Sequence, residues 1–396
     1  MLSNGLAAPE TVCTVSGYLE EATEMTIESR TALVYCENQF GRVDGKTAAG
    51  LVRHSETYDV VGVIDSARAG QDAGEALGGE HCGIPIFSGL DDALRKLGKT
   101  PAFYIYGKAP LEAVLCNGER GKIIAAMVAG MDIVNGLHQF FTEDHEFVHM
   151  AALNGIRMID IRKPPKLQDL HVFTGRISEV NVPVVAVLGT DCACGKRTTA
   201  VELDKALKNQ GIASVLVVTG QSGVMQGARY GVPIDALTSQ FVIGEIENAV
   251  VEAFNNENPD IILVEGQSAV SHPAFLGSLG ILKGSMPDGV ILQHPPGRKA
   301  RCDFPALEMP MIEREIELIL AISGAKVLAI ALSHENLSGE DILDITADYE
   351  NRLSLPTTDV LSDGCQKLIG ALGKRFPRLG RKISRSRLAE NSALAA

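Results

Sequence analysis

The chain has 396 residues, of which 45% are hydrophobic and 21% are charged, and it contains 40 glycines and no tryptophan. This length allows two ordinary domains, and the composition is typical of a globular α/β protein, which excludes disordered and fibrous classes. The 36 basic and 49 acidic residues give a formal net charge of −13. Such a charge repels nucleic acid and anionic lipid at long range, so we expect a small-molecule substrate, with no nucleic-acid or membrane partner.

Both ends of the chain are polar. Residues 1–29 are expected to form a flexible leader, and residues 373–396 a basic tail that is solvated. No segment reaches the roughly 18 to 20 apolar residues of a membrane span. The eight cysteines show no framework spacing, which indicates reduced thiols and a cytoplasmic location. On general grounds we expect a homo-oligomer.

The fold is expected to open with a buried strand at Thr31–Cys36, a short apolar run between polar residues. Strands and helices then alternate, which predicts a parallel sheet covered on both faces, a Rossmann-like N-terminal domain over residues 30–175. Further strands are predicted at 58–64, 84–87, 102–106 and 158–161, with helices at 48–54, 90–97, 110–117, 122–134 and 143–154.

A proline-containing segment, Lys163–Lys166, can continue neither a helix nor a strand, so we place the domain boundary between Pro164 and Asn181. The alternation then resumes and predicts a P-loop NTPase-like, doubly wound parallel sheet over residues 176–372. Its strands are predicted at 184–188, 213–218, 261–265, 289–292 and 326–330, with helices at 196–209, 246–254, 311–322 and 340–350.

The strongest motif joins the strand at 184–188 to the helix that Lys196 opens. In this order backbone N–H groups surround an anion, glycine permits a close approach, and the helix N-terminus and a lysine add positive charge. An ordinary strand-to-helix turn is the alternative. We assign the phosphates of a cofactor to Gly189, Thr190, Gly195, Lys196, Arg197, Thr198 and Thr199.

This loop departs from the usual pattern of four residues between the glycines, followed by Lys and then Ser or Thr. Five residues separate Gly189 from Gly195, a spacing that resembles dethiobiotin synthetase and the cobyrinic acid amidases, and Arg197 follows the lysine. The displaced hydroxyls put a Mg²⁺ ligand in doubt, and the added arginine suits a ligand with more negative charge. Cys192 and Cys194 have no partner pair, so we predict no metal site.

Polar residues follow two other strands of the second half. Gln221 and Ser222 can bind a polar substrate or form an ordinary turn. Glu265 ends an apolar run, where it can hold a metal through water, deprotonate a nucleophile, or act as a structural acid. Because ligands bind beyond the carboxyl ends of parallel strands, we expect these residues to border one crevice.

Three more residues are candidates of lower specificity. His272 and His294 follow strand-like regions, where a histidine is either structural or catalytic, and Arg298 is expected to clamp a substrate carboxylate. In the first half, Gly41–Thr47 forms a shorter glycine-bounded loop. Its Lys46 is either a ligand for a second phosphate of the cofactor or a surface lysine.

Taken together, these motifs resemble the DgcN family over about residues 31–370. The proteins of that family carry a P-loop domain, and the characterised branch is described as N-acetyltransferases that act on D-glutamate. The matching segments are Gly189–Thr199, Thr219–Gly223, Tyr230–Asp235, Val264–Ser268, His294–Arg298, Gly45–Ala48, Asn135–His138 and Asp160–Pro165.

The resemblance implies acetyl transfer from acetyl-CoA, whose phosphates the loop would hold, to the amino group of D-glutamate. Glu265 or His272 would be the base, with Asp191 as a further catalytic candidate, and Ser268 would stabilise the oxyanion. An ATP- and Mg²⁺-dependent ligase and a non-catalytic nucleotide sensor are the alternatives. The residues assigned to the substrate are Gln221, Ser222, Gln267, Ser268, His294 and Arg298.

Overall fold

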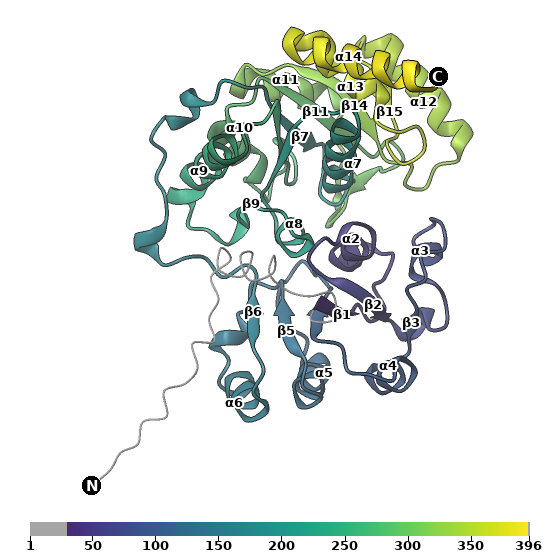
Figure 1. Cartoon of the computed structure of the whole chain (residues 1–396), viewed down its shortest axis with the longest axis vertical. Helices are drawn as coiled ribbons and strands as arrows, with labels where there is room; N and C mark the ends of the chain where they lie inside the picture. Colours follow the sequence, from purple (N-terminus) through teal and green to yellow (C-terminus); the bar gives the residue numbers. More distant parts are fainter. Residues whose placement is uncertain (1–29, 395–396) are drawn as a thin grey trace. The chain divides into compact units, whose positions relative to one another are not determined.

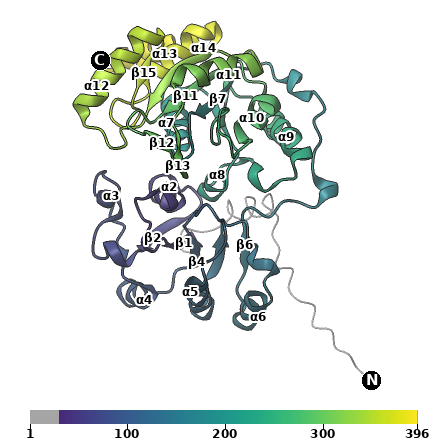
Figure 2. The same ribbon diagram turned by 180° about the vertical axis from the view of Figure 1, so that it is seen from behind.

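A computed structural model describes residues 30–394 of the chain, so the expected leader at 1–29 lies outside the described residues (Figure 1). The chain forms two compact units. The first extends to Lys166 and also includes Gln221–Gly227, and the second includes Leu167–Gly220 and the chain from Ala228 onward. Each unit is an α/β fold around a parallel sheet, as expected (Figure 2).

The first unit has a six-stranded sheet of order β3-β2-β1-β4-β5-β6, the strand order of dinucleotide-binding folds. A hydrophobic core between the sheet and helices α4, α5 and α6 covers one face. The strands are β1 Thr31–Tyr35, β2 Asp59–Ile64, β3 Ile86–Phe87, β4 Phe103–Tyr106, β5 Asp132–Asn135 and β6 Met158–Asp160, and the helices are α2 Lys46–His54, α3 Ala73–Ala76, α4 Leu90–Leu97, α5 Asn117–Val128 and α6 His145–Asn154.

A helix from the second half of the sequence, α8 (Gln221–Gln226), packs on α2 within the first unit. The hydroxyls of Thr47 and Ser222 lie 3.0 Å apart across this contact. A Cβ atom on Gly50 would lie 2.3 Å from the side-chain nitrogen of Gln226, so glycine permits the close approach. The sequence predicted a loop here beside the Gly189–Gly195 loop, and the structure instead has a helix that belongs to the other unit.

One predicted helix of the first unit, at 110–117, is absent, and another, at 122–134, extends too far. Residues 110–116 are irregular, and Ala113 has a φ of +54°, which a right-handed helix does not allow. The helix predicted at 122–134 ends as α5 at Val128, Gly130 then adopts a φ of +85°, and β5 follows. A glycine with positive φ directly after a helix is a common stop signal, and the prediction overlooked it.

The second unit has a seven-stranded parallel sheet of order β15-β14-β11-β7-β10-β8-β9, with β7 between β10 and β11. One hydrophobic core packs α9, α10 and α11 on one face, and another packs α7, α13 and α14 on the opposite face (Figure 1). The strands are β7 Val184–Gly189, β8 Ser214–Val218, β9 Tyr230–Gly231, β10 Ile261–Glu265, β11 Gly289–His294, β14 Val327–Leu332 and β15 Thr357–Thr358.

The remaining elements of this unit, among the described residues, are a hairpin, seven α-helices and three short 3-10 helices. The hairpin pairs β12 (Ala300–Arg301) with β13 (Phe304–Glu308) in antiparallel fashion. The predicted helices and strands of this half are all present: those at 196–209 and 261–265 have the predicted ends, and the others have shifted ends. The helices are α7 Lys196–Asn209, α9 Ser239–Glu257, α10 Gly277–Ser285, α11 Ile312–Ser323, α12 Gly339–Leu353, α13 Gln366–Arg375 and α14 Pro377–Leu394.

The basic tail is a helix for most of its length. Leu379 and Ile383 of α14 are 3% and 6% exposed and pack into the second unit's core, so the prediction of a solvated extension is wrong for this part. Basic residues such as Arg381 and Lys382 lie between these two buried residues, so the net charge of the segment gave no sign of its apolar face. None of the helices within residues 30–394 has the length and apolarity needed to cross a bilayer.

Candidate functional site

The candidate site lies at the carboxyl ends of three neighbouring strands of the second unit: β7, β10 and β11. The chain places β8 and β9 on one side of this trio and β14 and β15 on the other, so the order of the strands reverses here. Ligands of open parallel sheets bind at such a reversal. Gly189 leads from β7 into the loop, Glu265 ends β10, and His294 ends β11.

The loop 190–195 needs its two flanking glycines. A Cβ atom on Gly189 would lie 2.8 Å from both the Cys194 sulfur and the Lys196 side chain, and Gly195 has a φ of +106°. The first backbone hydrogen bond of α7 runs from Thr199 to Gly195, so the amides of the first turn have no acceptor within the helix. This geometry suits an anion at the helix start.

Lys196 points into the loop rather than into solvent. Its side chain is buried, and its Nζ donates a hydrogen bond of 2.5 Å to the Asp191 carbonyl oxygen and lies 3.6 Å from the Cys194 sulfur. The ammonium therefore lies against the backbone of the loop itself. A phosphate oxygen bound here would take the place of the Asp191 carbonyl as its partner.

The side chain of Asp191, a catalytic candidate, anchors the loop. It is fully buried, and its Oδ2 accepts hydrogen bonds of 2.7 Å from the Arg298 guanidinium and from the Cys302 backbone. Arg301 lies 3.7 Å from its Oδ1 and donates to the Thr190 carbonyl. Two arginines and one amide thus tie the loop to the segment that contains the β12–β13 hairpin.

Arg298 has no donor left over in this arrangement. In addition to its bond with Asp191, the guanidinium donates to the carbonyl oxygens of Cys192 and Ala193, at 2.7 and 3.2 Å. Its remaining donors bind the Glu335 carboxylate. The sequence suggested that Arg298 clamps a substrate carboxylate. In the structure it binds the loop, and only the contact with the half-exposed Glu335 could be exchanged for a ligand.

His272 is paired with Asp191 inside the protein. Its Nδ1 accepts a hydrogen bond from the Ala274 amide, so the neutral ring carries its proton on Nε2, which lies 3.6 Å from Asp191 Oδ1. The ring packs against Phe275 and Phe304. Burial lowers the pKa of His272, and the charge of Arg301 lowers it further, so the ring is neutral at pH 7.

The donor atoms of Asp191, Cys192 and His272 lie within 4.8 Å of one another, close enough to hold a metal ion. Two observations favour a close contact between a neutral histidine and a carboxylate instead. The Nε2 atom of the neutral ring carries a proton and has no free lone pair, and Asp191 already binds one guanidinium and faces another.

Glu265 is a buried carboxyl group that faces the first turn of α7. Its Oε2 lies 3.6 Å from Arg197 Nη1 and makes no hydrogen bond with any of the described residues. Burial raises the pKa of Glu265, and the charges of Arg197 and Lys196 offset only part of this rise. A buried carboxyl group with a raised pKa binds a proton more tightly than an exposed one, which suits it to accept a proton from a substrate.

The segment after Glu265 is held close to the loop. A Cβ atom on Gly266 would lie 2.3 Å from the Val187 carbonyl oxygen, so only glycine fits. The Gln267 amide donates to the Thr219 carbonyl, whereas the hydroxyl of Ser268 is buried and makes no hydrogen bond within residues 30–394. Ser268 also has a φ of +52°, a strained conformation that is enriched at functional sites.

Two predicted threonines, one in the loop after β7 and one in the first turn of α7, bind side chains at the end of β11. The hydroxyl of Thr190 lies 2.8 Å from Nδ1 of His294, and that of Thr199 donates to the side-chain oxygen of Gln293 at 2.5 Å. Thr198 is half-exposed on the first turn of α7. The structure thus brings together all the predicted site residues of the second unit.

The other predicted residues belong to the first unit. Lys46 is exposed at the start of α2, and Gln221 and Ser222 lie in α8, which packs on that helix. By their contacts, these three residues group with the first unit.

Sequence reasoning missed several residues that hold the site. Arg301 binds Thr190 and Ser271, and the buried carboxylate of Glu315 accepts hydrogen bonds from the Val270 and Ser271 amides next to His272. Arg301 carried a signal, because it lies in a basic run, 298–301, that follows Pro-Pro-Gly in an acidic chain. Glu315 carried none, since it lies in a helix of ordinary amphipathic pattern.

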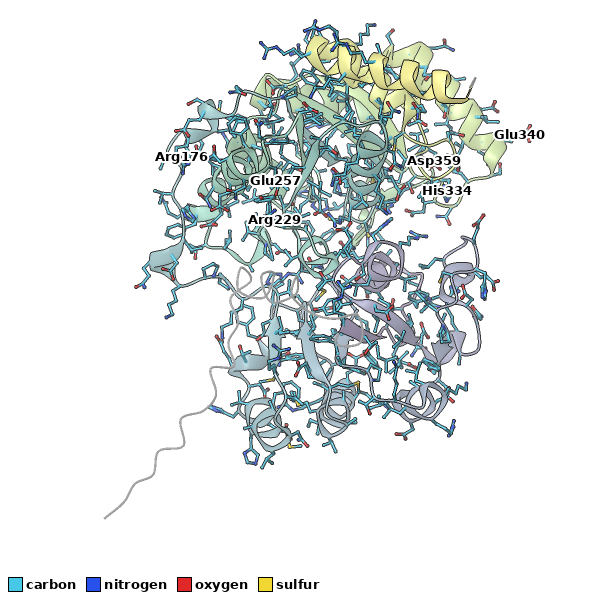
Figure 3. All side chains as sticks on the ribbon, in the orientation of Figure 1. Arg176, Arg229, Glu257, His334, Glu340 and Asp359 are labelled. Carbon is cyan, nitrogen blue, oxygen red and sulfur yellow. The ribbon has the colours of Figure 1, made fainter. Side chains whose placement is uncertain are left out.

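Replacing Arg298 with methionine should cost about 3 to 5 kcal/mol of unfolding free energy, because Asp191 would remain buried without its partner. The control is Arg229→Met, which removes an exposed ion pair with Glu257 and should cost at most about 1 kcal/mol (Figure 3). Urea unfolding of both variants measures the difference. Equal losses would show that the Asp191 pair does not stabilise the unit.

The free energy of unfolding should decrease as the pH is lowered, because of His294. Burial and the charge of Arg298 lower the pKa of His294 to about 4 in the folded protein. Below about pH 6.5 this histidine therefore becomes protonated in the unfolded chain while it stays neutral in the folded one, which favours unfolding. From pH 7 to pH 4.5 this removes about 2 to 3 kcal/mol, and His294→Gln should flatten the pH profile by that amount. Urea unfolding at both pH values tests this, and an unchanged profile would contradict it.

Two family models match the chain, each mainly over a part of one unit. One, described as "Domain of unknown function (DUF1611_C) P-loop domain", matches residues 171–369, and the other, "Domain of unknown function (DUF1611_N) Rossmann-like domain", matches residues 66–164. These descriptions agree with the two folds seen here.

Similar proteins include two curated relatives and one solved structure. A protein from Pseudoalteromonas sp is 32% identical over 63% of this chain and 75% of its own length, and one from Tritonibacter scottomollicae is 28% identical over 63% and 74%. Both are named D-glutamate N-acetyltransferase. The crystal structure of a DUF1611 family protein from Anabaena variabilis is 29% identical, with a TM-score of 0.79 over 87% of this chain and 99% of that one. This chain therefore belongs to the DUF1611 family.

Proposed function

We propose that this protein is an N-acetyltransferase that moves the acetyl group of acetyl-CoA to the amino group of D-glutamate. The names of the two curated relatives support this reaction. The observation in the site that carries the proposal is the position of Glu265. Its buried carboxyl group, with a raised pKa, lies 3.6 Å from Arg197 at the start of α7. A proton acceptor thus adjoins a loop that is suited to phosphate.

The acyl donor fits the charges of the loop. CoA carries a pyrophosphate and a 3′-phosphate, and Lys196 and Arg197 place two cations next to the amides of the first turn of α7. In a chain of net charge −13, such a local cluster is what holds an anion. With a phosphate anchored there, the flexible pantetheine arm can fold back and bring the thioester toward Glu265.

Glu265 is better placed than His272 to act as the base. The acceptor reaches the site as an ammonium and must lose a proton before its nitrogen can attack. The lone pair of His272 Nδ1 already binds the Ala274 amide, whereas Glu265 Oε2 is not hydrogen-bonded within the described part of the chain. We assign the base to Glu265, and to His272 the role of fixing Asp191.

Acetyl transfer then follows from these positions. Glu265 accepts a first proton from the ammonium and releases it to solvent. The nitrogen then forms a bond to the thioester carbon and gives a second proton to Glu265, while the Ser268 hydroxyl can donate a hydrogen bond to the oxygen that becomes negative. The bond from carbon to sulfur breaks, and the CoA thiolate takes the proton that Glu265 holds. An acceptor carboxylate could bind Arg298 in place of Glu335.

An ATP- and Mg²⁺-dependent ligase is the second candidate. An acidic residue at the end of the strand next to the loop strand, as Glu265 is, holds the metal in many nucleotide-binding proteins of this fold. In that reading Lys196 would bind the β- and γ-phosphates. Arg197 at the usual hydroxyl position counts against it.

Incubating the purified protein with acetyl-CoA and either D- or L-glutamate separates these candidates. We expect N-acetylglutamate and free CoA thiol in equal amounts, with the D-isomer preferred, and no requirement for ATP. Mass spectrometry of the products with a thiol assay measures both. ADP formation that depends on Mg²⁺ and substrate, or the absence of acetyl transfer to either isomer, would contradict the proposal.

Lys196→Ala should weaken CoA binding by about 1.5 to 3 kcal/mol, because a charge-assisted hydrogen bond to phosphate is lost. This corresponds to a rise of roughly 10- to 150-fold in Kd, measurable by calorimetry. Lys283→Ala, an exposed lysine of α10, is the control and should bind CoA as the wild type does. An unchanged Kd in the Lys196 variant would refute the role of that lysine.

A further inference from the structure

The residue directly after the loop lysine determines which ion accompanies the phosphate. In loops of the usual pattern this residue is Ser or Thr, and its hydroxyl binds Mg²⁺. Here the position is held by Arg197, in the first turn of α7. Its guanidinium is largely buried, with 18% of the side chain exposed.

The partner of Arg197 is the group that would otherwise face the metal. Strand β10 pairs directly with β7, and Glu265 lies opposite Val187, near the point where the loop begins. In Mg²⁺-dependent proteins of this fold the acidic residue at such a strand end holds the ion. Here the Glu265 carboxylate lies 3.6 Å from the Arg197 guanidinium, so a side-chain cation occupies the place between loop and acid.

The hydroxyls near this position do not restore a metal site. Thr199 is 1% exposed, and its hydroxyl binds Gln293, while the hydroxyl of Thr190 lies 2.8 Å from His294. Thr198 is half-exposed but lies one residue, or about 100° of helix rotation, beyond the metal-binding position. A divalent ion beside Glu265 would also be repelled by Arg197.

We propose that the loop binds its ligand as a metal-free phosphate or pyrophosphate ester, with Arg197 in the place of Mg²⁺. The guanidinium both neutralises the Glu265 carboxylate and presents donors to phosphate oxygens. The proposal deepens the proposed function, since it rests on a phosphate-bearing donor at this loop. It assigns to Arg197 the choice between a free phosphate ester such as CoA and a Mg²⁺–nucleotide.

Calorimetric titration with CoA and with ATP, each in EDTA and in excess MgCl₂, tests this. For the wild type we expect the Kd of CoA to change less than about twofold when Mg²⁺ replaces EDTA. Arg197→Ser, which recreates the usual Lys-Ser pair, should lose about tenfold or more in EDTA and regain ATP affinity with Mg²⁺. Arg197→Gln, the matched control, should lose affinity and regain none.

The outcomes separate this inference from the acetyltransferase proposal. If the wild type binds either ligand about tenfold or more tightly with Mg²⁺, the inference is overturned, whatever the acyl donor. Metal-free binding of ATP but not of CoA would support the inference and contradict acetyl-CoA as donor. Binding of neither ligand would overturn both. Arg197→Lys keeps the charge and should remain independent of Mg²⁺, which provides a readout if the other variants do not fold.

Discussion

The buried carboxylate of Asp191 is the charge around which the site is organised. Removing a carboxylate from water costs several kcal/mol unless partners surround it, and here the partners are Arg298, Arg301 and the Cys302 amide. These partners come from the segment that follows β11, so the loop after β7 has one position relative to the neighbouring strand end. The Nζ atom of Lys196 donates a hydrogen bond to the Asp191 carbonyl, so the position of the loop also fixes the position of the lysine. The rigidity of the loop after β7 therefore depends on a largely buried ion pair.

Most of the fold could be predicted from the sequence, because buried parallel strands are short runs of Val, Ile, Leu and Ala between polar turns. The failures have local causes. Strand β5 follows α5 after only three residues, so in the sequence the apolar side chains of the strand look like a continuation of the helix. The positive φ of Gly130 marks the end of the helix in the structure. Helix α8 could not be assigned to the first unit from local pattern, because its partner, α2, is distant in the sequence.

The candidate site was predictable in part. The loop at 189–199 and Glu265 carry local signals, since each directly follows or ends an apolar run that only a buried strand explains. The functions of Arg298 and Asp191 were not predictable, because they bind each other across more than a hundred residues of chain. The local sequence around a charged loop residue is the same whether its side chain binds a ligand or holds the loop in place. Its role becomes clear only from the residues that it contacts in the folded protein.

The claim that the loop after β7 binds the phosphates of the acyl donor is tested most directly by a crystal structure of the protein with CoA. We predict a phosphate oxygen within hydrogen-bonding distance of Lys196 Nζ and the Arg197 guanidinium, with the lysine released from the Asp191 carbonyl. CoA bound elsewhere, with Lys196 still on that carbonyl oxygen, would contradict the central claim.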